Sequence, residues 1–478
     1  MNRILHPAYK GGIPMKKRFL SLLLALALAL VLPLASLAEG PGGTPPGDPP
    51  SGEMGMPGGE GGDFGGGTPP GGSTSDFTYT ASVEITAAET QESQTYASET
   101  ADESSVIVNT PEQVSLINPT VTKTGDSDGG DNCNFYGLNA GVLAMGGTTL
   151  SISGGTISTD ASGANGVFSY GGNGGQNGAE GDGTTVIISD TVITTTGNGS
   201  GGIMTTGGGI MYANNLTVTT SGGSSAPIRT DRGGGTVYVD GGTYTANGLG
   251  SPAIYSTADV NVANATLISN LSEGVCIEGQ NSITLTDCDL TANNTQCNGN
   301  ATFLDTIMIY QSMSGDADSG TSAFTMTGGS LTSRSGHMFH VTNTHAVITL
   351  SGVTLNNEGS DILLSVCDDG WSGASNIAEL NAVSQALAGT ILVGSNSTLT
   401  LTLTEGSSFE GTFSGEITNS KGTEVSTELG TVNVSLDETS TWTLTGDTWI
   451  TSFDGSAEQV ISSGYTLYVN GTALEGTK

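Results

Sequence analysis

Three aspartates lie close together in the segment GDSDGGDN, where glycines separate them, at positions Asp126, Asp128 and Asp131. Carboxylate oxygens on a glycine-containing loop are ligands that Ca²⁺ prefers in proteins. The segment lacks the bidentate glutamate of an EF-hand at the required distance, so a solvated turn is the alternative. Asp316 and Asp318 in SGDADSG form a weaker version of the pattern. Calcium is therefore the one cofactor that the sequence suggests, with the first three aspartates as its candidate ligands.

Basic side chains are scarce, and only two of them stand close together after residue 38. Arg229 and Arg232 occur in the segment PIRTDRGG. Guanidinium groups match carboxylates in a bidentate geometry, so the pair could hold an acidic ligand. Pairing with the intervening Asp231, or with main-chain carbonyls of a turn, is the alternative that the sequence favours. Arg229 and Arg232 are nevertheless the candidate ligand-binding residues.

No complete catalytic set is recognisable. The Asp-Asp-Gly at 368–370 resembles part of a polygalacturonase motif, but the Asn-x-Asp, Gly-His-Gly and Arg-x-Lys elements that would accompany it are missing. A glycosidase needs two positioned carboxylates, one of them kept protonated. His337, His340 and His345 could bind a metal, although strand alternation predicts that His337 and His340 point in different directions. We therefore predict no catalytic residues and favour a protein that is not an enzyme.

A repeated unit must position these side chains. Segments such as TLSISGGTIST, TVIISDTVITT and TVYVDGGTYTA share one pattern, which is typical of a solenoid, and its basic length is 23 to 24 residues. Each copy contains a Gly, Asn or Asp, the residues that most readily enter the left-handed conformation of a sharp corner. The predicted corners are Asn118, Gly154, Asp190, Asn214, Gly241, Asn264, Asp287, Gly328 and Gly352.

Apolar residues occupy the positions four and two residues before every predicted corner, as in Val186 and Ile188 or Ile210 and Tyr212. The residues between them are mostly polar, which is the alternation of a strand with one buried face. A second strand follows each corner, and its inward column is apolar except at Thr217. A third short strand lies about a dozen residues before each regular corner. The sequence therefore predicts an all-β, right-handed parallel β-helix with three short strands per coil.

The chain divides into four predicted parts. Residues 1–38 are typical of a signal peptide, with Met15 as the natural start, and residues 39–78 are a Gly/Pro-rich, disordered tether. Residues 79–375 form the regular coils, and residues 376–478 form irregular coils and a closing cap. We expect Trp442 and Trp449 to pack in this cap, and a platform for a sugar is the alternative. The protein is thus expected to be secreted or located at the cell surface.

The charge of the chain limits its partners. Its 46 acidic and 11 basic side chains give a formal net charge of −35. Five basic residues and no acidic ones precede residue 39, so the predicted mature chain carries about 6 − 46 = −40 charges. Such a surface repels nucleic acid and anionic lipid, and we expect no membrane insertion of the mature chain. The five cysteines show no metal-site or disulfide spacing and are expected to be mostly free or buried.

Several segments carry a resemblance to known proteins, namely residues 100–110, 121–144, 310–329, 440–453 and 464–471. On these segments the chain resembles secreted right-handed parallel β-helix proteins of the pectate-lyase-like superfamily, and is most similar to an adhesin-like branch. The resemblance spans about residues 79–478 and implies the fold. It implies little about activity, because the superfamily includes lyases, hydrolases, binders and adhesins.

Three functional hypotheses follow. The leading one is a non-catalytic binding protein, adhesin-like, that holds carbohydrate through one long face or through insertion loops at 124–136, 171–184, 293–302 and 311–321, which should leave the rod at only two corners. The second is a calcium-dependent lyase or hydrolase acting on acidic polysaccharide. The third is a structural spacer of the cell envelope. The sequence leaves the ligand and the oligomeric state open.

Overall fold

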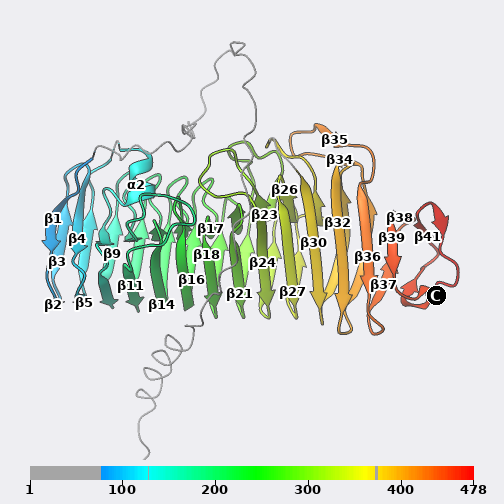
Figure 1. The fold of residues 1–478 in the computed structure, drawn as a ribbon, viewed down its shortest axis with the longest axis horizontal. Coiled ribbons are helices and arrows are strands. Elements are labelled where there is room, and N and C mark those ends of the chain that lie inside the picture. The colour runs from blue at the N-terminus through cyan, green and yellow to red at the C-terminus, as the bar shows by residue number, and fades with distance from the viewer. Residues whose placement is uncertain (1–76, 128, 372–374) are drawn as a thin grey trace, which may run out of the picture. The chain divides into compact units, whose positions relative to one another are not determined.

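The computed structural model describes residues 77–127, 129–371 and 375–478. The predicted signal peptide and nearly all of the predicted tether lie outside these residues. Almost every element in the described part is a β-strand, and strands far apart in sequence stack in chain order (Figure 1). No helix in this part is long and apolar enough to cross a membrane. The predicted parallel β-helix is thus confirmed.

The first face of the solenoid, sheet A, is fully parallel. Its strands follow one another along the chain, one from each coil, in the order β1, β4, β7, β10, β13, β15, β17, β20, β23, β26, β29, β31, β33, β37 and β40. Their bounds are Thr80–Ile85, Glu103–Asn109, Val142–Met145, Val167–Tyr170, Ile203–Thr206, Ile228–Thr230, Ile254–Ser256, Val275–Glu278, Asp305–Tyr310, His337–Thr342, Ile362–Val366, Ala386–Val393, Ser408–Ser414, Thr441–Leu444 and Val460–Ile461.

The second face, which we name face B1, is also parallel. It contains β2 (Glu89–Glu92), β5 (Gln113–Ile117), β8 (Thr149–Ser153), β11 (Thr185–Ser189), β14 (Gly209–Thr220), β16 (Gly235–Ala246), β18 (Asp259–Ala263), β21 (Ser282–Thr286), β24 (Thr321–Thr327), β27 (His345–Ser351), β30 (Asn376–Val383), β32 (Ser397–Thr404), β36 (Thr431–Leu436) and β39 (Ser452–Asp454).

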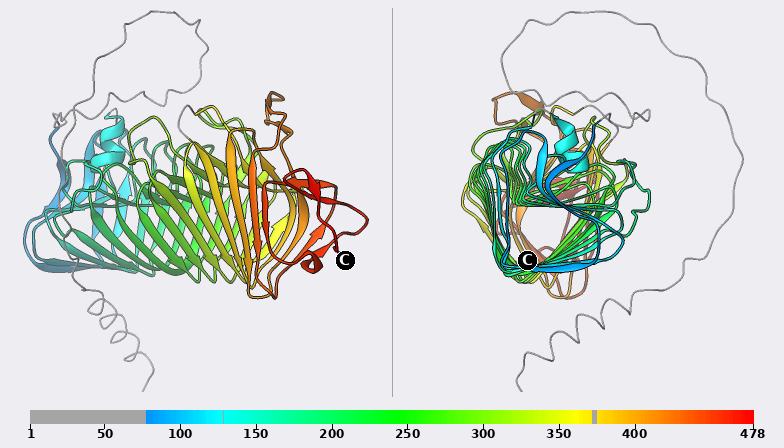
Figure 2. Two further views of the ribbon diagram at one scale, coloured as in Figure 1. Left: turned by 45° about the vertical axis from the view of Figure 1, so that its right-hand side comes forward. Right: turned by 90° about the vertical axis from the view of Figure 1, so that its left-hand side faces the viewer.

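The third face, face B2, contains β3 (Thr95–Ser98), β6 (Thr120–Lys123), β9 (Thr156–Thr159), β12 (Val192–Thr195), β19 (Thr266–Ser269), β22 (Asp289–Ala292), β25 (Ser330–Ser333) and β28 (Thr354–Asn357). The long strands β14 and β16 bend from face B1 into face B2, which joins the two faces into one sheet. Figure 2 shows the faces end-on around the interior. Beyond β28 no described strand joins face B2, whereas β34 (Ile417–Thr418) and β35 (Glu424–Ser426) pair with each other and the cap contains a small sheet of its own.

The inward side chains form one continuous apolar core, because in-register pairing places equivalent residues on top of one another. Val114, Leu150 and Val186 are successive partners and all are fully buried. Burying each such side chain contributes roughly 1.5–3 kcal/mol. The predicted period-two columns are therefore the interior of the solenoid.

The predicted corners adopt the left-handed conformation with one exception. Asn118, Asp190 and Gly241, for example, have φ of 49°, 51° and 72°. In the coil of β14 the corner is Asn215, with φ of 53°, and not the predicted Asn214. Two adjacent asparagines can each occupy the left-handed region, so the sequence did not distinguish them.

This one-residue shift inverts the predicted orientation of β14. Met211 and Val218 are fully buried, whereas Tyr212 is 38% exposed. Thr217, the exception in the predicted column, is exposed and therefore obeys the alternation of the corrected register. The prediction that Ile210 and Tyr212 point inward is wrong because the segment IMYANN has apolar residues in both registers.

The C-terminal cap treats its two tryptophans differently. Trp442 is fully buried and donates its indole N–H to the carbonyl of Gly411 at 3.0 Å. Trp449, on β38 (Thr448–Ile450), is 50% exposed and stacks on Tyr468, so only Trp442 is buried in the cap. The strands β38, β41 (Leu467–Val469) and β42 (Thr472–Ala473) form a separate small sheet.

The cysteines follow the expectation that they are free or buried. Cys276, Cys288 and Cys367 are buried free thiols, and Cys297 is a half-buried free thiol. Cys133 is buried on the short helix α2 (Asp131–Tyr136).

A ladder of serines fastens consecutive coils at the corner before sheet A. The hydroxyl oxygen of Ser200 accepts from the amide of Ala164, Ser225 accepts from Ser200, and Ser251 accepts from Ser225, each at 2.9 Å. Each hydroxyl also donates to a main-chain carbonyl, as Ser225 does to Gly197 at 3.0 Å. The ladder satisfies buried amides that have no partner in a β-sheet.

Replacing Ser225 by alanine should therefore destabilise the protein. The Ser225→Ala change leaves the amide of Ser200 and the carbonyl of Gly197 without this buried partner, at a cost of roughly 1–3 kcal/mol in the free energy of unfolding. Denaturant titration followed by circular dichroism measures the effect. The exposed Ser158→Ala variant is the control and should lie within about 0.5 kcal/mol of wild type. Equal losses in both variants would contradict the role of the ladder.

Candidate functional site

The insertion loops gather around the outer surface of sheet A. Loops 124–136 and 293–302 precede strands β7 and β23 of this sheet, and loops 171–184 and 311–321 follow β10 and β23. They therefore leave the solenoid at the two corners that border sheet A, as the sequence predicted, and Figure 1 shows them on one side of the stack. The outer surface is consequently covered in the middle of sheet A, whereas Glu84 on β1 and Glu410 on β33, near the two ends of the sheet, are exposed.

Aromatic packing buries the N-terminal part of this surface. Helix α2 lies in loop 124–136, and its Phe135 is 8% exposed. The outward side chains Leu143, Phe168 and Met204 of sheet A are fully buried in a separate apolar cluster that includes Tyr136. This end of sheet A thus has a second, external core.

Arg232 ties three insertion loops together. Its Nε and Nη2 donate to Asp316 Oδ1 in loop 311–321, at 3.0 and 2.6 Å. Its guanidinium carbon lies 4.3 Å from the ring centroid of Phe135 on helix α2. The next residue, Gly233, donates its amide to Asn177 Oδ1 of loop 171–184 at 3.0 Å. Arg232 therefore acts as a structural hub.

Arg229 makes the pairing that the sequence favoured. Its Nη2 lies 2.8 Å from Asp231 Oδ2, and its Nη1 donates to the carbonyl of Ser224 at 2.8 Å. Burial raises the pKa of Asp231 to about 7, although the adjacent Arg229 opposes the shift. Both candidate arginines thus have protein partners, and binding of an acidic ligand by them stays a prediction.

Glu278, at the end of β20 in sheet A, holds loop 311–321 in place. It is 1% exposed and accepts hydrogen bonds from Tyr255 at 2.7 Å and Tyr310 at 3.0 Å. Ser312 and Ser314 of the loop also donate to its Oε1. Burial raises the pKa of Glu278, while these hydrogen bonds oppose the shift. The carboxylate is fully engaged in holding the loop.

A histidine cluster brings together residues that the sequence singled out separately. Ser365 Oγ lies 2.8 Å from His337 Nδ1 and 2.7 Å from His340 Nδ1. His340 Nε2 lies 3.4 Å from Asp369 Oδ2, and Asp369 Oδ1 accepts from the amide of Thr302 at 2.6 Å. The expectation that His337 and His340 point in different directions is wrong. His337 is the first residue of β26 and lies at a corner, where side chains do not yet alternate between the two faces of the strand.

This cluster has serine, histidine and aspartate in contact but no access for a substrate. His340 and Ser365 are fully buried, and Asp369 is 1% exposed. Burial and the neighbouring His340 lower the pKa of His337 to about 3, so its imidazole stays neutral. His345 faces elsewhere and pairs with Glu379 at 2.9 Å. Among the described residues no group of three or more His, Cys, Asp or Glu side chains is arranged to hold a metal.

The predicted calcium ligands are engaged differently. Asp126 Oδ1 accepts from the amide of Ser162 in the next coil at 2.8 Å. Asp131 begins helix α2, and burial, together with the nearby Asp316, raises its pKa. Asp128 lies outside the described residues. Calcium binding by the three aspartates therefore stays a prediction.

An exposed aromatic ladder lies on the outside of face B1. Tyr212 on β14 and Tyr238 on β16 are paired across the strands, with ring centroids 5.1 Å apart and planes at 9°. They are 38% and 39% exposed. Because the predicted register of β14 was wrong, the sequence did not identify Tyr212 as exposed. Tyr238 could have been identified, since it lies between the inward-pointing Val237 and Val239 in TVYVDGG.

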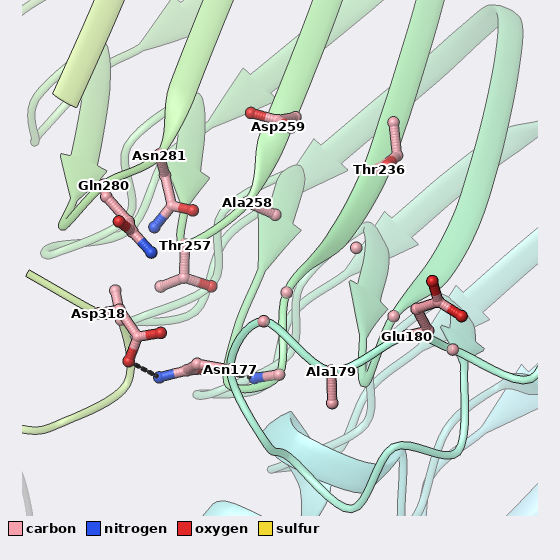
Figure 3. Close-up of a pocket in the computed structure, with 17 residues that line it drawn as sticks. Asn177, Ala179, Glu180, Thr236, Thr257, Ala258, Asp259, Gln280, Asn281 and Asp318 are labelled. Atoms are coloured by element: carbon pink, nitrogen blue, oxygen red, sulfur yellow. Dashed lines mark hydrogen bonds between the residues drawn. The ribbon is translucent and has the colours of Figure 1, made fainter. Parts of the chain in front are cut away.

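A polar groove adjoins this ladder. It has a volume of about 340 Å³ and lies between loops 171–184 and 311–321 at the start of face B1. Figure 3 shows Thr236, Asp259, Gln280 and Asn281 around it, with Asn177 bonded to Asp318 where the two loops meet. Thr236 precedes Tyr238 by two residues on β16, so both point outward, about 7 Å apart. Groove and ladder form one surface.

No protein-family model, curated protein or solved structure matches this chain. The strand pairing establishes the parallel β-helix independently of any relative.

The buried carboxyl groups should make stability depend on pH. Burial raises the pKa of Asp131, Asp231, Glu273, Glu278 and Asp305. A group whose pKa is raised on folding adds stability below its unfolded pKa and loses it as the pH rises through the folded value. For Asp231 this interval runs from 3.8 to about 7. His337, whose pKa is lowered to about 3, acts in the opposite direction, but the five carboxyl groups together should give a higher melting temperature at pH 5 than at pH 8 in calorimetry.

Asp305→Asn should weaken this dependence. Asp305 is fully buried, and neither carboxyl oxygen has a hydrogen-bond partner among the described residues. An amide at this position needs no proton to stay neutral, so the difference in melting temperature between pH 5 and pH 8 should shrink. Asp361→Asn, at an exposed carboxylate, is the matched control. An unchanged difference in Asp305→Asn would contradict the prediction.

Arg232→Met should loosen the loops without unfolding the solenoid. Methionine keeps much of the packing but removes hydrogen bonds to a charged partner, which contribute roughly 1.5–3 kcal/mol. Hydrogen exchange of loops 171–184 and 311–321 should accelerate about tenfold or more. Arg334→Met is the control, because Arg334 forms only an exposed pair with Glu358 at 4.0 Å. Similar exchange in both variants would show that Arg232 is not the hub.

Proposed function

We propose that this protein is a non-catalytic extracellular or cell-surface protein that binds carbohydrate on the outside of face B1. The observation that carries the proposal is the exposed Tyr212–Tyr238 ladder beside a groove lined with amide, hydroxyl and carboxylate groups. Ligand sites typically combine an apolar surface with a few polar groups that fix the orientation of the ligand. A pyranose ring has both kinds of surface, with C–H bonds on its faces and hydroxyls at its edge.

The ladder ends where a sugar ring could extend it. Tyr238 pairs with Asn261 on β18, so the face of its ring that points away from Tyr212 has no aromatic neighbour across the strands. Adjacent strands lie about 4.8 Å apart, which leaves room for one ring over Asn261. The electron-rich face of a tyrosine attracts the polarised C–H bonds of a sugar. A pyranose stacked on Tyr238 therefore continues the ladder.

Polar side chains surround that position. Asp259 and Asn261 are outward neighbours on β18, and Asp259 also lines the groove together with Thr236 and Gln280. Carboxylate and amide groups can accept and donate hydrogen bonds to several hydroxyls at once. The groove thus supplies polar contacts for a second sugar unit next to the stacked one.

The charge of the chain favours a neutral glycan. With a formal net charge of −35, the protein repels polyuronates and sulfated polysaccharides. The buried positions of the histidine cluster and of Glu278 support a binding rather than a catalytic role, because a substrate has to reach the reacting groups. The extracellular location rests on the predicted signal peptide.

Tyr238→Ala should weaken glycan binding at this site. Loss of the stacking surface should weaken the affinity for neutral oligosaccharides of four to six units about tenfold or more, or roughly 1.4 kcal/mol. Isothermal titration after a glycan-array screen measures the change. Thr243→Ala, at an exposed position of the same strand on face B2, is the control and should bind as wild type. Release of unsaturated or reducing ends from pectin or alginate would instead favour a lyase or hydrolase.

A further inference from the structure

The C-terminal cap carries a second exposed aromatic pair. Trp449 on β38 lies opposite Tyr468 on β41, with ring centroids 5.0 Å apart and planes at 6°. The distance and angle are close to those of the Tyr212–Tyr238 ladder, although the two pairs belong to different sheets. Half of the Trp449 side chain is exposed.

The preceding coil meets β38 through Thr448, whose Oγ1 accepts from the amide of Phe413 at 3.1 Å, so a ligand can reach only the exposed half of Trp449. The small sheet runs β38–β41–β42, so β38 is its edge, and Trp449 is on the side of Tyr468 away from β42. The flanking residues Thr448 and Ile450 are buried, which holds β38 in place and turns the indole outward. Trp449 is thus a rigid, outward-facing ring.

Polar groups stand beside the ring. Asp447 is exposed two residues before Trp449, and its Oδ1 accepts from the amide of Thr466 at 2.8 Å. Thr466 in turn precedes Tyr468 by two residues. No hydrogen bond is formed by the second oxygen of Asp447 within the described part of the chain, so it can accept from a ligand hydroxyl in a charge-assisted bond.

We propose that Trp449, with Tyr468 and Asp447, is a second carbohydrate-binding site, which takes a pyranose ring on the exposed surface of the indole. Trp449 supplies the stacking surface, and Asp447 orients the ring by accepting from its hydroxyls. The site does not use Tyr238 or the groove, so it extends the proposed function and does not depend on it.

A protein partner fits this surface less well. Stable protein interfaces bury about 800 Å² on each side, with a continuous apolar centre. The exposed apolar side chains in this part of the cap are Trp449, Ile461 and Tyr465, and charged Asp447 lies next to the indole. This is an area suited to one or two sugar units.

Two sites on one rigid solenoid change how the protein holds a polymer. Once one site has bound a long chain, the other meets the same chain or a neighbouring one at a high effective concentration, so avidity exceeds either affinity. The protein would then retain insoluble or cell-wall glycan far more strongly than it binds short oligosaccharides.

Tryptophan fluorescence of the full chain tests this site directly, because Trp442 is fully buried and Trp449 is the most exposed tryptophan. Neutral oligosaccharides of four to six units should change the emission of wild type and of Tyr238→Ala equally. They should leave that of Trp449→Ala unchanged. Titration should give two sites in wild type and one in each variant, with about tenfold weaker retention of insoluble polysaccharide in either variant. Tyr465→Ala, at another exposed aromatic residue of the cap, is the control for the emission change.

Three outcomes would overturn the inference. One is a panel in which no oligosaccharide changes the emission through Trp449 while binding through Tyr238 persists, which leaves the proposed function intact. Another is an emission change that survives Trp449→Ala. The third is a change of oligomeric state in Trp449→Ala, seen by light scattering, with unaltered sugar binding, which would identify a second copy of the chain as the occupant. Binding through Trp449 but not through Tyr238 would instead support this site and reject the first.

Discussion

Each coil of this protein satisfies its main-chain hydrogen bonds through the coils on either side, and this requirement governs the rest of the structure. Parallel, in-register pairing forces equivalent residues to stack, so an apolar side chain in one coil lies on an apolar side chain in the next, as Val114 does on Leu150. The same rule holds at the corners, where the serine ladder supplies partners for amides that leave the sheet. A residue that cannot stack in register therefore disturbs the main-chain hydrogen bonds between coils as well as the packing of its own side chain.

Insertions are tolerated only where they do not interrupt this stacking, which explains why the long loops leave at the corners that border sheet A. Once outside, they have to be fastened to the outer surface of sheet A. The structure uses polar contacts for this purpose: Arg232 with Asp316, Glu278 with Ser314, and Asp369 with Thr302. A buried ionisable group lowers the stability of the fold unless it is paired or protonated. Several such groups lie under the loops, where their partners hold the loops in place.

Faces B1 and B2 are free of these long loops at the corner between them, and face B1 carries the tyrosine ladder. An aromatic pair on a rigid strand array loses little conformational entropy when a ligand stacks on it. The second pair in the cap follows the same design with a tryptophan. Both aromatic pairs thus lie on rigid strands, and the buried clusters support the groove indirectly by ordering the loops around it.

The amino-acid sequence predicts the all-β solenoid, the length of its coil, the corners and the two edges from which the loops emerge, because these features repeat and each copy supports the others. It failed where a single copy had to decide between two registers, as at Asn214 and Asn215, and where orientation depends on a corner, as at His337. It could not show that Asp369 meets His340 or that Arg232 meets Asp316, since these partners lie far apart in the chain and no repeat links them. These residues meet only in the folded protein, because the coil from which each loop leaves determines which side chains the loop can contact. The exposure of Trp449 also follows from the tertiary structure, since the burial of Thr448 and Ile450 on either side of it turns the ring outward.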